Sequence, residues 1–104
     1  MGRKKHVDHL KEFKIELSHH ITVQKMILFG SRAWGRPHKD SDFDILIVSS
    51  SFRNIKSMKR GLGFYKYWHL DYAVDFLLYT PEEFKKLSKQ ITIVREAARK
   101  GIRI

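Results

Sequence analysis

One stretch of the chain, residues 29–48, reads FGSRAWGRPHKDSDFDILIV. It ends an apolar segment at Gly30-Ser31 and places Asp42 and Asp44 at the head of the apolar run 45–48. An apolar run without alternation is typical of a strand that is covered on both faces. The stretch therefore predicts a strand, a glycine turn, and a central strand that begins with two carboxylates.

The flanking segments alternate between helical and extended patterns. Apolar residues recur at spacings of three and four over residues 7–21, which predicts a first helix. Residues 23–29 and 72–79 are rich in β-branched and large apolar side chains, which predicts two further strands. Residues 31–35 predict the start of a short helix before a loop at Pro37. These elements predict a single α/β (α+β) domain over residues 1–104 with a small mixed sheet.

Helical spacing also appears in the second half of the chain. One set of apolar residues predicts a helix weakened by two glycines: Phe52, Ile55, Met58 and Leu62. The sequence Thr80-Pro81-Glu82-Glu83 predicts a capping box and a last helix that stops at Gly101. This helix should turn one set of residues inward, with a break near residues 90–92: Phe84, Leu87, Ile91, Val94 and Ala98.

Composition limits the environment and the partners. The formal charge of +10 predicts attraction to polyanions such as nucleotides, nucleic acid or an acidic protein. The chain contains no cysteine, so disulfides and thiolate metal sites are excluded. The first thirty residues contain neither an apolar signal core nor a membrane span, so we expect no membrane association and a cytoplasmic location.

The two carboxylates of the opening stretch predict a metal site. Alternate residues of a strand share a face, so Asp42 and Asp44 should point the same way while Phe43 points into the core. Close carboxylates repel each other unless a positive charge lies between them. Mg²⁺ prefers oxygen ligands and completes its shell with water and substrate phosphates. The alternative for Asp42 is a role as a cap of its own loop.

The glycine turn predicts a phosphate site. Gly30 lets the backbone approach closely, and Ser31 adds a hydroxyl donor next to amides that can face the β and γ phosphates of a nucleotide. Arg32 and Arg36 flank the turn and either contact phosphate or form surface ion pairs. Trp34 either stacks on a base or, in the favoured interpretation, packs as an aromatic anchor beneath the turn.

A third acid lies inside the later apolar strand. Asp75 is flanked by Val74 and Phe76, and a carboxylate is unusual inside such an apolar strand. It could bind a metal ion and draw a proton from an attacking hydroxyl, or form a buried salt bridge. Asp71 lies four residues earlier and should point to the same face of the strand. Because it lies at the strand's edge, we favour Asp75 for this role.

These residues together resemble the minimal nucleotidyltransferases of the DNA polymerase β superfamily. The shared pattern is Phe29-Gly30-Ser31, ten intervening residues, Asp42-Phe43-Asp44, and later Val74-Asp75-Phe76. Either motif alone is weak, but the combination at this spacing is specific. The resemblance extends from about residue 25 to the C-terminus and implies a polymerase β palm-like sheet with helices on one main side.

The resemblance also implies an activity. Members move a nucleoside monophosphate from a nucleoside triphosphate, such as AMP from ATP, to an acceptor hydroxyl and release pyrophosphate. By resemblance, Gly30 and Ser31 hold the triphosphate, Asp42 and Asp44 bind two Mg²⁺ ions, and Asp75 binds the catalytic ion. Minimal members are commonly paired with small helical HEPN proteins, which they nucleotidylate as antitoxins to the HEPN toxin.

Residues 56–68 leave two interpretations open. Basic residues there alternate with aromatic ones, a mixture that binds single-stranded nucleic acid and that also occurs in protein interfaces. Larger nucleotidyltransferases carry an added domain for the base or the acceptor. Without one, either the acceptor is a protein or small molecule held at the open site, or a partner chain completes the site. The alternative function is a non-catalytic antitoxin or a basic nucleic-acid-binding module.

Overall fold

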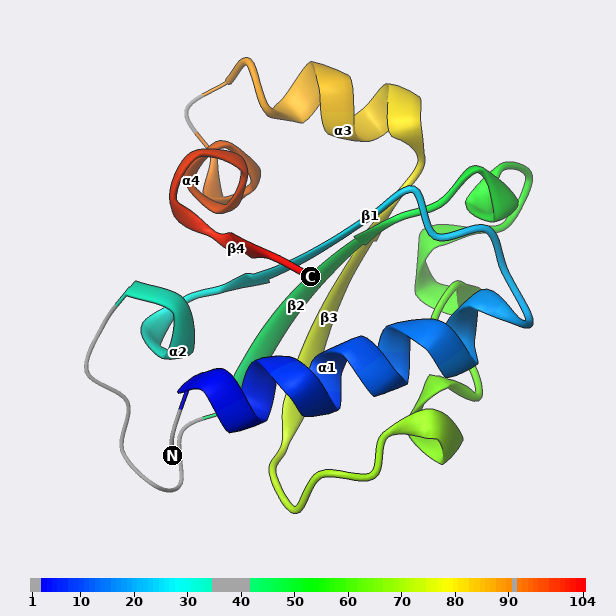
Figure 1. Cartoon of the computed structure of the whole chain (residues 1–104). Helices are drawn as coiled ribbons and strands as arrows, with labels where there is room; N and C mark the ends of the chain where they lie inside the picture. The colour runs from blue at the N-terminus through cyan, green and yellow to red at the C-terminus, as the bar shows by residue number, and fades with distance from the viewer. Residues whose placement is uncertain (1–2, 35–41, 91) are drawn as a thin grey trace.

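The computed structural model of the chain describes residues 3–34, 42–90 and 92–104. In chain order its elements are α1 (Arg3–Ser18), β1 (Lys25–Phe29), α2 (Ser31–Trp34), β2 (Phe43–Val48), the 3₁₀ turns η1 (Ser50–Phe52), η2 (Ser57–Lys59) and η3 (Phe64–Tyr67), then β3 (Val74–Tyr79), α3 (Pro81–Leu87), α4 (Ile93–Lys100) and β4 (Ile102–Arg103). The four strands form one sheet in the order β3-β2-β1-β4 (Figure 1). β2 and β3 are parallel, and the other neighbours are antiparallel, so the predicted mixed sheet is confirmed.

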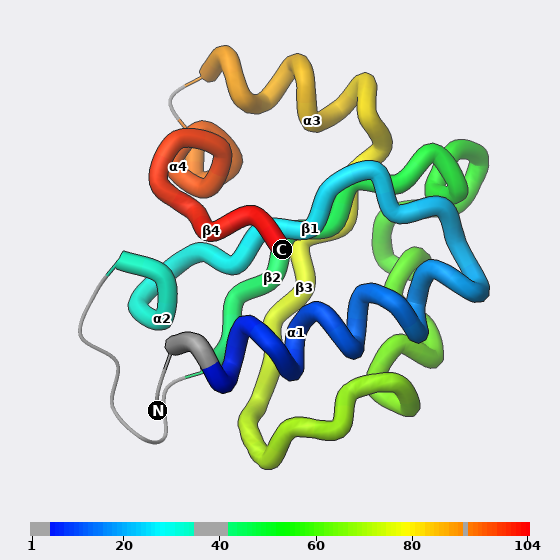
Figure 2. Tube along the Cα trace, in the orientation of Figure 1, coloured from blue at the N-terminus to red at the C-terminus, as the bar shows by residue number. Residues whose placement is uncertain are grey.

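The sheet separates two apolar cores. Side chains of α1 pack on one face against Phe43, Ile45 and Ile47, while α3 and α4 pack on the other face against Leu46 and Val48. Figure 2 shows the same arrangement, with the sheet between α1 and the α3–α4 pair. The expectation of helices on one main side is therefore wrong, because an apolar strand such as β2 needs cover on both faces.

β2 is the centre of this arrangement, as its unbroken apolar run predicts. It pairs with β1 on one side and β3 on the other, and the residues from Ile45 to Val48 are buried. Because successive side chains alternate between faces, Asp44 lies on the same face as Leu46, the face covered by α3 and α4. The first helix is also confirmed, with Leu10, Phe13 and Leu17 buried.

The helix-start signal at Thr80 is confirmed in full. The Thr80 hydroxyl accepts from the Glu83 amide, and the Glu83 carboxylate accepts from the Thr80 amide. The predicted break is also present, since α3 ends at Leu87 and Thr92 caps a separate helix, α4. Because α4 starts as a separate helix, its buried side differs from the predicted one. Ala97 is buried and Ala98 is exposed, contrary to the prediction. Ile91 lies outside the described residues.

The predicted helix over residues 52–62 is wrong. The chain there forms the short turns η1 and η2 instead, joined by Asn54, which has a φ of 67°. Extended backbone at Lys56, with a ψ of 138°, also prevents a continuous helix. Phe52 is buried, but the other three members of the predicted stripe are exposed: Ile55, Met58 and Leu62.

The C-terminal strand β4 is a feature that the sequence did not predict. Gly101 ends α4 as expected, but its φ of −70° is ordinary, so glycine is required there for space. A Cβ on Gly101 would lie 2.3 Å from Ile27 Cγ2 and 2.5 Å from the Ala97 carbonyl oxygen. The close approach lets β4 pair with β1 immediately afterwards. Within the described residues, no helix combines the length and apolar character that crossing a membrane requires.

Candidate active site

Two of the predicted acids are neighbours in the sheet. Asp44 of β2 and Asp75 of β3 are register partners, and each is the second residue of its strand. Register partners on adjacent strands project from the same face. Asp42 precedes β2 and is exposed, Asp75 is exposed, and Asp44 is half-buried. The structure thus brings the three predicted acids to one end of the two parallel strands.

The glycine turn lies against the same carboxylate. Phe29 pairs with Asp44 across β1 and β2, and Gly30 follows with a φ of +77°. A Cβ built on Gly30 would lie 2.3 Å from Asp44 Oδ2. Glycine is therefore required twice, because other residues disfavour a positive φ and because a side chain would collide with Asp44. Ser31 begins α2 directly beside this contact.

The electrostatics of the site reflect crowded carboxylates. Burial raises the pKa of Asp44 above its ordinary value, and the nearby charges of Asp75 and Asp42 raise it further. A carboxylate set that repels itself fits Mg²⁺, because a divalent cation between the oxygens would remove the repulsion. In the part of the chain that the structure describes, no three His, Asp or Glu side chains converge as they would around a bound ion. The ligands would have to converge on binding.

The structure also separates Asp75 from its alternatives. None of the ion pairs found among the described residues involves Asp75, and its side chain is exposed, so a buried salt bridge is not its role. Asp71 is exposed and precedes β3, outside the register that pairs Asp75 with Asp44. Asp75 is therefore the acid that lies beside Asp44, and its part in the site stays a prediction.

Arg32 lies inside the protein instead of at its surface. Its side chain is 7% exposed, and its Cζ lies 4.5 Å from the ring centroid of Phe43 and 4.6 Å from that of Tyr72. The ring of His6 packs edge-on against the same two rings. The guanidinium therefore ties α2 to the start of β2 and to the segment that leads into β3. Its predicted contact with phosphate stays a prediction.

Sequence reasoning missed this packing because its members lie far apart in the chain. His6 and Tyr72 carry no local motif. In the fold, burial lowers the pKa of His6, and the charge of Arg32 lowers it further. The anchoring role predicted for Trp34 is wrong, since the side chain is 40% exposed at the end of α2. Arg36 lies outside the described residues.

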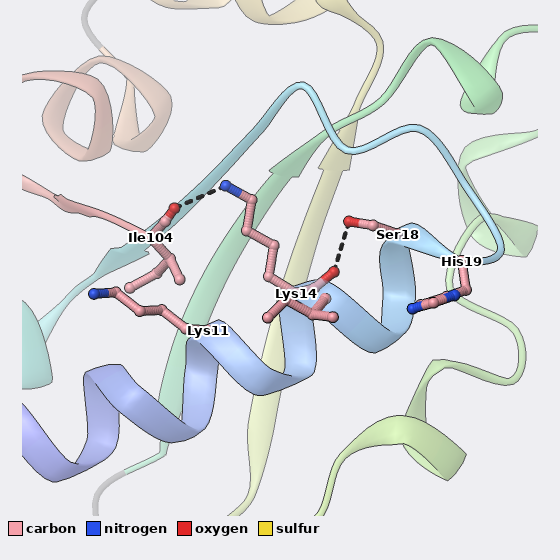
Figure 3. Close-up of a pocket in the computed structure, with 6 residues that line it drawn as sticks. Lys11, Lys14, Ser18, His19 and Ile104 are labelled. Atoms are coloured by element: carbon pink, nitrogen blue, oxygen red, sulfur yellow. Dashed lines mark hydrogen bonds between the residues drawn. The ribbon is translucent and has the colours of Figure 1, made fainter.

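A large hollow lies away from the acids. A cavity of about 510 Å³ is lined by residues of α1 and the C-terminus: Lys11, Lys14, Ile15, Ser18, His19 and Ile104. Figure 3 shows Lys14 Nζ donating to the Ile104 carbonyl oxygen, at 2.9 Å. Its lining includes no Asp or Glu side chain, so it lacks the ligands of a magnesium site.

Comparisons with known proteins bear on the family and the fold of this chain. The family model described as a nucleotidyltransferase domain matches residues 9–100. The crystal structure of a proposed nucleotidyltransferase from Sulfolobus solfataricus is similar to this chain, with a TM-score of 0.66 and 22% sequence identity, covering 82% of this chain and 76% of that one. At that identity the likeness concerns the fold. No curated protein is significantly similar in sequence to this chain.

Proposed function

Because this chain belongs to the family of nucleotidyltransferase domains, we propose that it is a Mg²⁺-dependent enzyme that moves a nucleoside monophosphate, AMP in the first instance, from a nucleoside triphosphate to an acceptor hydroxyl. The observation that carries the proposal is the contact of the Gly30 turn with Asp44, whose register partner is Asp75. This contact joins a phosphate-binding turn to a metal-binding carboxylate pair. Either element alone would fit many phosphate-handling proteins.

Each residue has a role in this proposal. Asp42 and Asp44 would hold both metal ions, and Asp75 would hold the catalytic ion and accept the proton of the attacking hydroxyl. Gly30 and Ser31 bind the triphosphate through backbone amides and the serine hydroxyl. When bound, Mg²⁺ would supply charge neutralisation for the displacement. The protein contributes mainly position, and Arg32 keeps the turn and the strand in place.

The acceptor we propose is a hydroxyl on a protein partner, of the HEPN class to which the sequence resemblance points. Asp42 and Asp75 are exposed, which leaves the site open to a side chain of another protein. A net charge of +10 favours association with an acidic surface. The protein would then act as an antitoxin by nucleotidylating its partner.

The second candidate is a non-catalytic antitoxin or a basic nucleic-acid-binding module. The charge of +10 is the observation that favours it, since basic proteins bind nucleic acid without sequence preference. In that case the three acids would have no catalytic role. A steep fall of RNA or DNA affinity with salt would accompany this function.

The two functions differ in one experiment. The protein is incubated with a co-purified partner, ATP and Mg²⁺, and the intact masses of both chains are measured. If the protein is the enzyme, the partner should gain the mass of one nucleotidyl group, which is a nucleoside monophosphate less one water. This gain should be lost in Asp42→Asn and retained in Asp71→Asn. No gain, with partner inhibition unchanged in Asp42→Asn, would favour the non-catalytic antitoxin.

A further inference from the structure

The segment between β2 and β3, which carries the turns η1 to η3, exposes three aliphatic side chains. Met58 is 85% exposed, Leu62 is 75% exposed and Ile55 is 40% exposed. Lys56 and Lys59 lie between them in the chain and are also exposed. We call these five residues the 55–62 surface. Single exposed apolar side chains are ordinary on a protein surface, whereas several on one short segment are candidates for an interaction site.

The segment that carries this surface is anchored at both ends. Phe52 before it and Phe64 after it are buried, and their ring centroids lie 6.2 Å apart. The chain between these rings therefore forms a loop held closed by the core. Ile55, Met58 and Leu62 stay outside the core although the loop that carries them is fixed to it.

Arg60 holds the middle of the loop. Its side chain is 8% exposed, and Nη1 donates to the Leu78 carbonyl oxygen at 3.1 Å and to Glu83 Oε1 at 2.6 Å. Glu83 is itself fixed by the capping box of α3. Arg60 thus fastens the loop to β3 and α3, so the surface is preformed and a partner would not have to order it.

The aromatic residues of the neighbouring η3 are largely engaged in the fold. Tyr65 Oη donates to a backbone carbonyl at 3.1 Å, and Trp68 Nε1 donates to another at 2.8 Å. The ring of Tyr67 stacks on His20 with centroids 4.6 Å apart. Within residues 56–68, Tyr65 alone among the aromatic residues is exposed. Binding of single strands relies on successive free rings, so these contacts disfavour nucleic acid.

The charge around the surface indicates the character of its partner. Among the described residues, no ion pair involves Lys56 or Lys59, whereas the nearby Arg53 and Arg60 are paired with Glu82 and Glu83. Two free lysines beside three exposed aliphatic side chains are complementary to carboxylates beside apolar side chains. A second copy of this chain, with a charge of +10, would be repelled. A membrane surface would be met by an amphipathic helix, and here the backbone forms only short turns.

We infer that the 55–62 surface docks an acidic, aliphatic segment of a partner protein. The surface lies on turns that follow the C-terminal end of β2, whereas Asp42, Asp44 and Asp75 lie at the start of β2 and β3. Docking here leaves the acids free, so the inference stands whether or not the acids are catalytic.

The test measures binding of a labelled helical peptide with a leucine face and a glutamate face. Met58→Ser with Leu62→Ser should weaken binding at least about tenfold, since burial of each side chain contributes to affinity. Lys56→Glu with Lys59→Glu should weaken it similarly and reduce its salt dependence. Two matched controls, Ile15→Ser with 63% exposure and Lys85→Glu with Lys86→Glu, should bind as the wild type does.

Three further measurements identify a different occupant. The double variant Met58→Ser with Leu62→Ser is also tested with a single-stranded RNA oligonucleotide and with anionic vesicles. Loss of RNA or vesicle binding in this variant, with peptide binding unchanged, would overturn the inference. So would a wild-type dimer in sedimentation that dissociates in this variant. Failure of the peptide to bind, or equal weakening in the control variants, would also contradict it. Unchanged melting temperatures should accompany the substitutions at Ile15, Met58 and Leu62.

Discussion

Asp44 and Asp75 are register partners at the start of two parallel strands, and they face the same side of the sheet. Neighbouring carboxylates repel, and the charge of Asp75 follows burial as the second cause of the raised pKa of Asp44. The fold therefore holds together two groups that disfavour each other. Such arrangements are typical of functional sites.

The first prediction concerns pH and Asp44→Asn. Folding raises the pKa of Asp44, so its contribution to stability is complete below the ordinary pKa of 3.8 and is lost as the pH rises through the raised value. Without metal, Asp44→Asn should melt at a higher temperature than the wild type at neutral pH. The difference should shrink in acid. Thermal unfolding followed by circular dichroism across pH measures it.

Added Mg²⁺ should reverse the order of the melting temperatures of the wild type and Asp44→Asn. A ligand that binds only the folded state stabilises it by an amount that rises with the logarithm of its concentration above the dissociation constant. The wild type should therefore gain melting temperature with added Mg²⁺, and Asp44→Asn should not. Asp71→Asn is the matched control and should respond as the wild type does. Equal responses of all three proteins would show that Asp44 binds no metal.

The second prediction concerns Gly30→Ala. The new Cβ would collide with Asp44 Oδ2, and the φ of +77° adds backbone strain, so the free energy of unfolding should fall by more than about 1 kcal/mol. Gly63→Ala is the control, because its φ is +87° and the nearest atom to its Cβ lies 4.0 Å away. The difference between the two losses in urea unfolding isolates the collision.

Removal of Asp44 should relieve that collision. In the double variant Gly30→Ala with Asp44→Ala, the glycine substitution should cost no more than it does at Gly63. A cost at Gly30 that does not depend on Asp44 would mean that the turn and the carboxylate are not in contact. The cycle also separates this contact from other effects of each substitution.

The sequence predicts the elements whose signals are local. β2 was recognisable from its unbroken apolar run, and α3 from the capping box at Thr80, because each signal lies within a few residues. The predicted helix over 52–62 failed because left-handed backbone at Asn54 and extended backbone at Lys56 override the apolar spacing. β4 has two residues and depends on Gly101 reaching β1, a contact that no short pattern encodes.

The candidate site was likewise predictable only where its signals are local in the sequence. Strand alternation predicts that Asp42 and Asp44 share a face, although β2 begins only at Phe43. The apolar neighbours of Asp75 mark it as unusual. The register that places Asp75 beside Asp44 is a property of the sheet, so it became visible only in three dimensions. The burial of Arg32 between Phe43 and Tyr72 has the same origin, since its partners lie in distant segments.

The third prediction concerns Arg32→Lys. A guanidinium stacks on two rings through its flat face, and an ammonium retains the charge but loses the stacking. The free energy of unfolding should fall by about 1–2 kcal/mol, the range of buried cation–π contacts. Arg99→Lys, at an exposed position, should change it little. Equal stability of both variants would mean that the two rings do not hold Arg32.

The most direct measurement is pyrophosphate release from ATP, in the presence of Mg²⁺ and the co-purified partner, by Asp75→Asn and Asp71→Asn. Because Asp75 is the register partner of Asp44, the rate of pyrophosphate release should fall more than about a hundredfold in Asp75→Asn. Loss of a residue that only supports a metal ligand usually costs less than this. Asp71→Asn should retain it. Equal rates in the two variants would contradict a catalytic site built on Asp44 and Asp75.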